Sequence, residues 1–195
     1  MTSLAGLLQR PPRKKIAKRQ LELRNRLWPD LDPKQLWSRH THDGYTTLPK
    51  CIPLIMSIMD DLAGVPVSPT YLELWCRTFD ENFVTLSKPR EMAFNSGFSG
   101  QRAERTWRAR LGTLADLGFI DVKAGPSGPA SYALVFNPYK VIQRHYDQKN
   151  SGLRQDKYHA LLERALEVGD ESLSPEPPAP PSFIAATEPA PGKAA

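Results

Sequence analysis

Residues 87–138 constrain the fold of this chain more than any other segment. A short stretch of helical character leads into Asn95-Ser96-Gly97, and a longer Arg-rich stretch then runs to Gly118. Two β-prone runs follow, and Gly125-Pro126-Ser127-Gly128-Pro129 separates them. Clusters of Gly and Pro between such runs mark tight turns. The segment therefore predicts two helices joined by a turn and followed directly by a β-hairpin.

The longer helix, expected over residues 100–117, has two different faces at 100° per residue. The apolar face consists of Ala103, Trp107, Leu111, Leu114 and Leu117. The opposite face carries glutamine, arginine and small residues, namely Gln101, Arg102, Arg105, Arg108, Ala109 and Gly112. Arginine can donate two hydrogen bonds to guanine and glutamine can pair with adenine, while small residues let a partner come close. A solvated helix face is the plain alternative, and the neighbouring elements favour nucleic-acid binding over it.

One arginine does not fit this pattern. Arg110 lies on the buried side of the predicted helix. We expect its side chain to extend past the edge of the core, or to pair with Asp116 or Asp121.

The charge is unevenly distributed along the 195 residues, whose formal net charge is +5. Residues 10–26 contain eight basic residues and one acid, Glu22. Residues 1–27 are therefore expected to form a basic N-terminal arm, with a marginal helix over residues 13–27. Its basic side chains would contact phosphates, although such runs are often solvated tails. The expected phosphate contacts are Arg13, Lys14, Lys15, Lys18 and Arg19.

Residues 28–138 are expected to form the main domain. Apolar spacing predicts a helix over residues 51–63 and a second helix capped by Ser68. The second helix is expected to bury Leu72, Trp75, Cys76 and Phe79. Residues 83–86 read as a strand or an extended link, and Ser87 as the cap of a short helix that Met92, Ala93 and Phe94 fill. Both cysteines, Cys51 and Cys76, lie in apolar helical patterns and are predicted to be buried free thiols.

The elements over residues 52–138 resemble the winged helix-turn-helix superfamily. The resemblance rests on their order, on SGF followed by RTW and ARLGTLADLGFI, and on the GPSGP loop. The phrase LGTLADLGFIDV is similar to the end of a recognition helix in bacterial regulators, plasmid replication initiators and related phage proteins.

This resemblance implies a fold that is mainly α with a small β-hairpin, a winged helix-turn-helix domain with flanking helices. It further implies that Gln101, Arg102, Arg105 and Arg108 enter the major groove of double-stranded DNA. Lys123 and Ser127 of the hairpin would then contact the DNA backbone, while a plain hairpin edge is the alternative for these two residues.

Residues 139–169 are predicted to form further helices. The last helix is amphipathic, so it either packs on its own domain or pairs with a second copy. DNA-binding proteins of about this length usually bind paired half-sites as dimers, so we expect a homodimer. Residues 170–195 are acidic and rich in proline, which predicts disorder. The apolar Ser182-Phe183-Ile184 in this tail could be a peptide that a protein partner binds.

Other classes of protein receive less support from the sequence. No apolar run approaches the roughly 20 residues of a membrane span. The N-terminal charges follow the short apolar stretch instead of preceding it, which argues against a signal peptide and for the cytoplasm. No phosphate-binding loop or hydrolase motif is present, so we expect neither an enzyme nor a cofactor. A polar loop explains His40-Thr41-His42-Asp43 better than a metal site does.

The sequence therefore favours a DNA-binding protein of bacterial or mobile-element type. It would act as a transcriptional regulator, or as a factor in plasmid or phage replication or maintenance. Two alternatives stay open, a protein-interaction adaptor built on a winged-helix scaffold and an RNA-binding protein.

Overall fold

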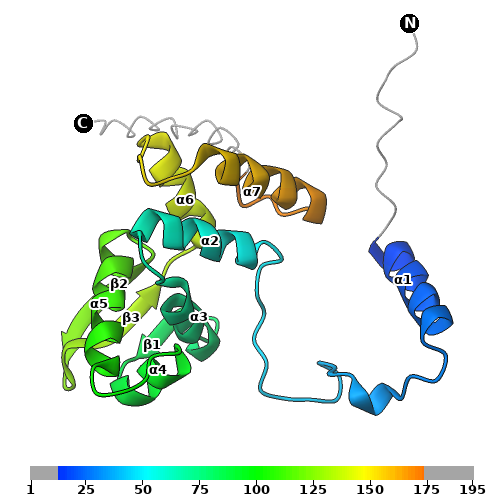
Figure 1. Ribbon diagram of the computed structural model, residues 1–195, viewed down its shortest axis with the longest axis horizontal. Helices are drawn as coiled ribbons and strands as arrows, with labels where there is room; N and C mark the ends of the chain where they lie inside the picture. Colours follow the sequence, from blue (N-terminus) through cyan, green and yellow to red (C-terminus); the bar gives the residue numbers. More distant parts are fainter. Residues whose placement is uncertain (1–12, 174–195) are drawn as a thin grey trace, which may run out of the picture. The chain divides into compact units, whose positions relative to one another are not determined.

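The computed structural model describes the backbone of residues 13–173 and the side chains of residues 15–173. The chain divides into two compact units between Thr46 and Thr47. The first unit contains helix α1 (Arg13–Leu27) and a short 3-10 turn, η2 (Pro33–Gln35). The helices of the second unit are α2 (Ile52–Ala63), α3 (Ser68–Arg77), α4 (Pro89–Asn95), α5 (Ala103–Asp116), α6 (Pro138–Asp147) and α7 (Gln155–Val168) (Figure 1). Its strands are β1 (Phe83–Thr85), β2 (Ile120–Gly125) and β3 (Gly128–Val135).

The strands form one antiparallel sheet in the order β1-β3-β2. Ala133 in the central strand pairs with Val84 on one side and with Val122 on the other. The amide of Leu86 donates to the carbonyl of Ser131 at 2.8 Å and continues the contact beyond β1. The described chain is thus mainly helical with a small antiparallel sheet, and the predicted hairpin has gained a third strand.

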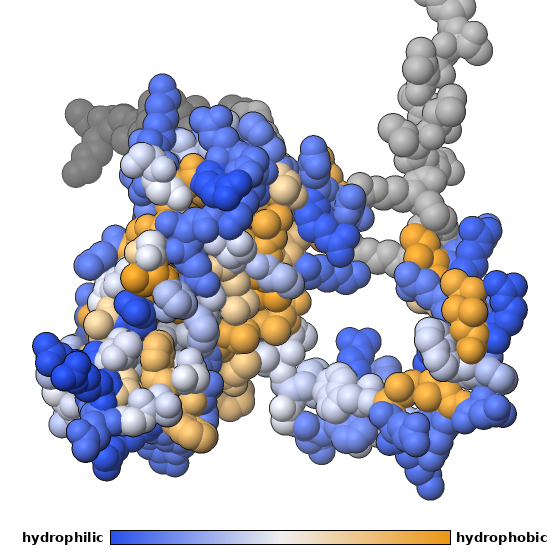
Figure 2. Space-filling model, in the orientation of Figure 1, coloured by the Kyte–Doolittle hydropathy of each residue, from blue (hydrophilic) through white to orange (hydrophobic). Residues whose placement is uncertain are grey.

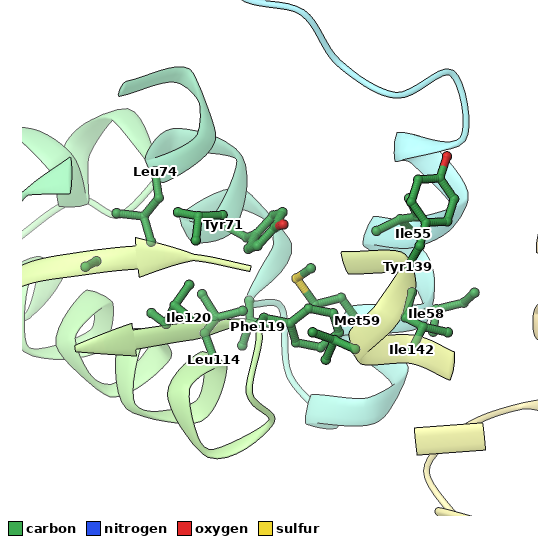
Figure 3. Packing of buried hydrophobic residues seen from close by; sticks show 14 of the residues in the cluster. Ile55, Ile58, Met59, Tyr71, Leu74, Leu114, Phe119, Ile120, Tyr139 and Ile142 are labelled. Carbon is green, nitrogen blue, oxygen red and sulfur yellow. The ribbon is translucent and has the colours of Figure 1, made fainter. Parts of the chain in front are cut away.

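The core of the second unit lies between the sheet and the helices (Figure 3). The Tyr71 ring meets the edge of Phe119 at a centroid distance of 6.0 Å, and its hydroxyl donates to the carbonyl of Phe136 at 3.1 Å. Helix α7 buries Tyr158, Leu161 and Ala165 in the same core. The last helix therefore packs on its own chain, which is one of the two roles that its amphipathic pattern allows.

Two predicted N-caps are wrong. Ser68 is the first residue of α3, and the Asp60 carboxylate of α2 accepts hydrogen bonds from the amides of Val67 (2.7 Å) and Ser68 (2.8 Å). A carboxylate at this end also suits the helix dipole. Helix α4 starts at Pro89 behind Lys88, without a side-chain cap from Ser87.

The predicted end of α3 is also wrong. Thr78 is extended, with ψ of 152°, so the helix ends at Arg77 and the next residues leave its apolar face. Phe79 is 84% exposed, whereas Leu74 is fully buried. Cys51 is buried as expected, but Cys76 is exposed.

Helix α5 ends at a glycine that the backbone requires. Gly118 has φ of +76°, which is unfavourable for other residues. Its amide donates to Ala115 and the amide of Phe119 donates to Leu114, both at 2.9 Å, which is the Schellman pattern. A Cβ atom at this position would also clash with the Arg144 guanidinium. Gly112 differs, because it lies within the helix and a Cβ atom there would meet nothing within 4 Å.

These two glycines predict opposite effects of the same substitution. Gly118→Ala should lower the free energy of unfolding by about 1–2 kcal/mol through backbone strain. Gly112→Ala should raise it by about 1 kcal/mol, because alanine favours a helix interior. Urea unfolding of both variants provides the measurement, and shifts of the same sign would contradict the geometry described for α5.

Candidate nucleic-acid interface

Helix α5 begins later than the sequence suggests. Gly100 has φ of +80°, which no helix tolerates, and the amide of Ala103 donates to its carbonyl at 3.2 Å in a turn. Helical geometry starts only at Ala103. Gln101 and Arg102 therefore belong to the turn before α5, not to its first helical turn as predicted.

The two faces of α5 agree with the predicted wheel. Trp107, Leu111 and Leu114 are buried in the core. On the outer side Arg105, Ala109 and Gly112 are exposed, and so are Gln101 and Arg102 in the preceding turn. Among the described residues, Arg102 and Arg105 form no ion pair. Their guanidinium groups are therefore available to an anionic partner.

Arg108 is engaged within its own helix. Its Nε and Nη2 atoms donate to Glu104 Oε1 at 3.0 and 2.9 Å, and both side chains are only partly exposed. Reasoning from the sequence missed this pair, although an acid four residues before an arginine is the spacing that predicts it. Arg108 would have to leave Glu104 before it could bind a phosphate or a base.

The pairing expected for Arg110 is not formed. Its buried Nε atom lacks a hydrogen-bond partner among the described residues. Asp121 Oδ2 instead lies 2.9 Å from the Lys123 ammonium, along β2. The side chains of Lys123 and Asp121 are 73% and 43% exposed, so water screens the attraction and a competing anion can displace the aspartate.

The β2–β3 hairpin lies against α5, because β2 contacts this helix (Figure 1). Ser127 is exposed at its tip, and its amide donates to Ser131 Oγ at 2.9 Å. This hydrogen bond holds the loop closed and leaves Ser127 exposed. The structure thus places the hairpin residues on the same unit as the exposed arginines of α5.

The predicted contacts of the arm lie on α1, in the other unit. Lys15, Lys18 and Arg19 are exposed, with Lys18 3.9 Å from Glu22. Arg13 and Lys14 are helical, and their side chains lie outside the described residues. Figure 2 shows hydrophobic side chains beside hydrophilic ones on this helix. The large apolar residues of α1 are exposed by 41% to 57%, namely Ile16, Leu21, Leu23 and Leu27.

Two exposed residues of α4 were not identified from the sequence as possible contacts to a partner. Phe94, which the sequence pattern placed in this short helix, is 72% exposed. Arg90 is exposed and forms no ion pair among the described residues. Both line a pocket of about 360 Å³ between the end of α4 and the start of α5, together with Phe98 and Gln101. A glutamine and an arginine beside two phenyl rings give this corner both polar and apolar contact groups.

An ionic network fixes α4 against α3. Arg77 on α3 pairs with Glu73 and donates to Glu91 of α4 at 2.9 Å, and Asn95 donates to Glu73 at 3.1 Å. The hydrogen bond from Arg77 and the nearby Lys88 ammonium hold the pKa of Glu91 below its usual value. This network holds the short helix from which the turn and α5 continue.

Removing the central guanidinium should loosen α4. Arg77→Met should lower the free energy of unfolding by about 1 kcal/mol at neutral pH, mainly through the half-buried bond to Glu73. Because the pKa of Glu91 is lowered, its share is present at neutral pH and is lost only as pH falls through that lowered value. In urea unfolding from pH 7 to 3, the difference between the two proteins should therefore decrease by the share of Glu91. Lys88→Met, which removes an exposed partner, is the control, and an equal loss there would contradict the network.

Within residues 13–173, no group of three or more His, Cys, Asp or Glu side chains is placed to hold a metal ion. In the same part of the chain, no helix has the length and apolar character needed to cross a membrane. Comparison of the sequence with protein-family models and curated proteins, and of the structure with solved structures, finds no match for this chain.

Proposed function

We propose that this chain binds double-stranded DNA, with α5 and the turn before it in the major groove. The observation that carries the proposal is the orientation of α5. Its apolar face is buried, and Arg102 and Arg105 lie exposed and unpaired among the described residues, next to Gln101. Arginine and glutamine are the side chains that pair with guanine and adenine edges.

The order of elements supports a winged helix-turn-helix domain. One helix and a strand (α3 and β1) precede α4, the turn and α5, and the β2–β3 hairpin follows directly. In this proposal α5 is the recognition helix and the hairpin is the wing. Lys123 and Ser127 of the wing contact the DNA backbone, and the exposed Lys and Arg side chains of α1 add contacts to phosphates.

The proposed cellular role is that of a cytoplasmic, non-enzymatic factor of bacterial or mobile-element type. It regulates transcription, or supports replication or maintenance of a plasmid or phage. The exposed basic residues support an anionic ligand such as DNA.

The first test selects bound sequences from random duplexes and then measures affinity for an enriched site. Arg105→Ala should weaken specific binding by about 1–3 kcal/mol, the value of one bidentate contact to a base. Arg164→Ala on α7 is the control, because Arg164 is another surface arginine on a helix outside the proposed interface, although it pairs with Glu167. It should leave affinity unchanged.

The proposal fails if the Arg102/Arg105/Arg108 triple alanine variant keeps full affinity for the selected site. If no duplex is enriched and a protein partner co-purifies with the chain, the results would favour the protein-interaction adaptor instead. Stronger binding to single-stranded RNA than to duplex DNA would favour an RNA-binding function.

The basic helix should contribute mainly through salt-dependent binding. Lys15→Ala should reduce the slope of log affinity against log salt concentration by about 0.9, the value for one phosphate contact. Affinity for selected and random duplexes should fall by the same factor, because phosphate contacts carry no sequence information. Lys149→Ala in the α6–α7 turn serves as the control. An unchanged slope for Lys15→Ala would remove α1 from the interface.

A further inference from the structure

The pocket between α4 and α5 combines an exposed phenyl ring with a partly buried one. Phe98 packs against the core of the unit, whereas Phe94 is 72% exposed. The turn between them holds this arrangement: the amides of Gly97 and Phe98 both donate backward, to Phe94 and Ala93, at 2.9 Å. Two rings thus line a pocket of about 360 Å³ that the core does not use.

The polar residues that line this pocket are one cation, Arg90, one acid, Glu104, and the neutral Ser99 and Gln101. Arg90 lines it, and Arg102 follows the lining residue Gln101 directly. Its one acid, Glu104, is engaged by the Arg108 guanidinium at 2.9 Å. The surroundings therefore favour an anionic partner that also offers a small apolar group.

Within the major groove of DNA, one apolar group is displayed among the hydrogen-bonding edges, the C5 methyl group of thymine, and phenylalanine is one of the side chains that contact it. We propose that Phe94 and Phe98 receive the methyl group of one thymine, with Gln101 placed to bond an adenine edge. This inference rests on the proposed function, since it assigns a base contact to the same interface.

The size of the effect follows from the group that is removed. Deoxyuridine pairs as thymidine does and lacks only the methyl group. Loss of one buried methyl-sized group corresponds to about a fourfold change in affinity.

The test replaces each thymine of a selected duplex by deoxyuridine, one position at a time, and measures binding of the full-length chain. At one position, deoxyuridine should weaken binding of the unaltered protein about fourfold. Phe94→Ala should bind the two duplexes equally, with about the affinity that the unaltered protein has for the deoxyuridine duplex. Phe79→Ala is the matched control, because Phe79 is another exposed phenylalanine, outside this pocket, and it should retain the fourfold ratio.

Urea unfolding checks that Phe94→Ala remains folded, which its exposure favours. The inference is overturned if deoxyuridine weakens binding at no thymine position. It is also overturned if Phe94→Ala distinguishes the thymidine duplex from the deoxyuridine duplex as strongly as the unaltered protein does. Either outcome is also what we expect if the pocket binds an apolar peptide of a protein partner instead of DNA. If Arg105→Ala still weakens binding in either case, only the thymine contact fails; if no duplex is selected at all, the proposed function fails with it.

Discussion

The burial of Trp107 fixes the rotation of α5, and the rest of the candidate interface depends on that rotation. Trp107 is fully buried, and its indole N–H has no hydrogen-bond partner among the described residues. An unpaired buried donor costs about 1–3 kcal/mol, which apolar packing around the ring must outweigh. Turning the helix by one residue, about 100°, would expose this ring and carry arginine toward the core. Arg105 lies about 200° around the helix from Trp107, so burial of the indole ring directs Arg105 outward.

The two ends of this helix are determined by backbone geometry. At its start, Gly100 has φ of +80° and prevents the helix from extending backward. At its end, Gly118 closes the last turn with Phe119, whose ring is buried against Tyr71. Backbone geometry therefore determines where α5 begins and ends, and the buried Phe119 ring also ties its end to the core. The turn residues Gln101 and Arg102 gain a defined position from this, without being helical themselves.

Local periodicity was enough to predict some of these features and not others. The apolar stripe of α5 and the hairpin were predictable, because both depend on residues near each other in the sequence. The pairing of Val84 with Ala133 joins segments that are distant in the sequence, so no local pattern could establish β1 as a strand. In α4, neighbouring Met92 and Ala93 are buried while Phe94 is exposed. With only two turns, such a helix does not define a stripe from which that difference could be read.

The candidate site shows the same division. Residue types and spacing indicated which cations face outward, but not which of them are already neutralised. The Glu104–Arg108 pair follows from an i,i+4 spacing on the predicted helix and was missed, whereas the Asp121–Lys123 pair depends on β2 reaching as far as Lys123. Arg90 and Phe94 join Gln101 only because the turn folds α4 back onto the start of α5. That tertiary contact is absent from any single helical pattern.

The paired cations have a consequence for how the proposed DNA complex would form. An exposed ion pair contributes at most about 1 kcal/mol, so a phosphate can replace the aspartate beside Lys123 at small cost. Replacing Glu104 beside Arg108 costs more, because that pair is partly buried and doubly hydrogen-bonded. Arg102 and Arg105 have no internal partner to leave among the described residues, and so can bind first. Recognition would then start at the beginning of α5, where Gln101 and the Phe94 pocket also lie, and Arg108 would be recruited only by a partner that offers it a better acceptor than Glu104 does.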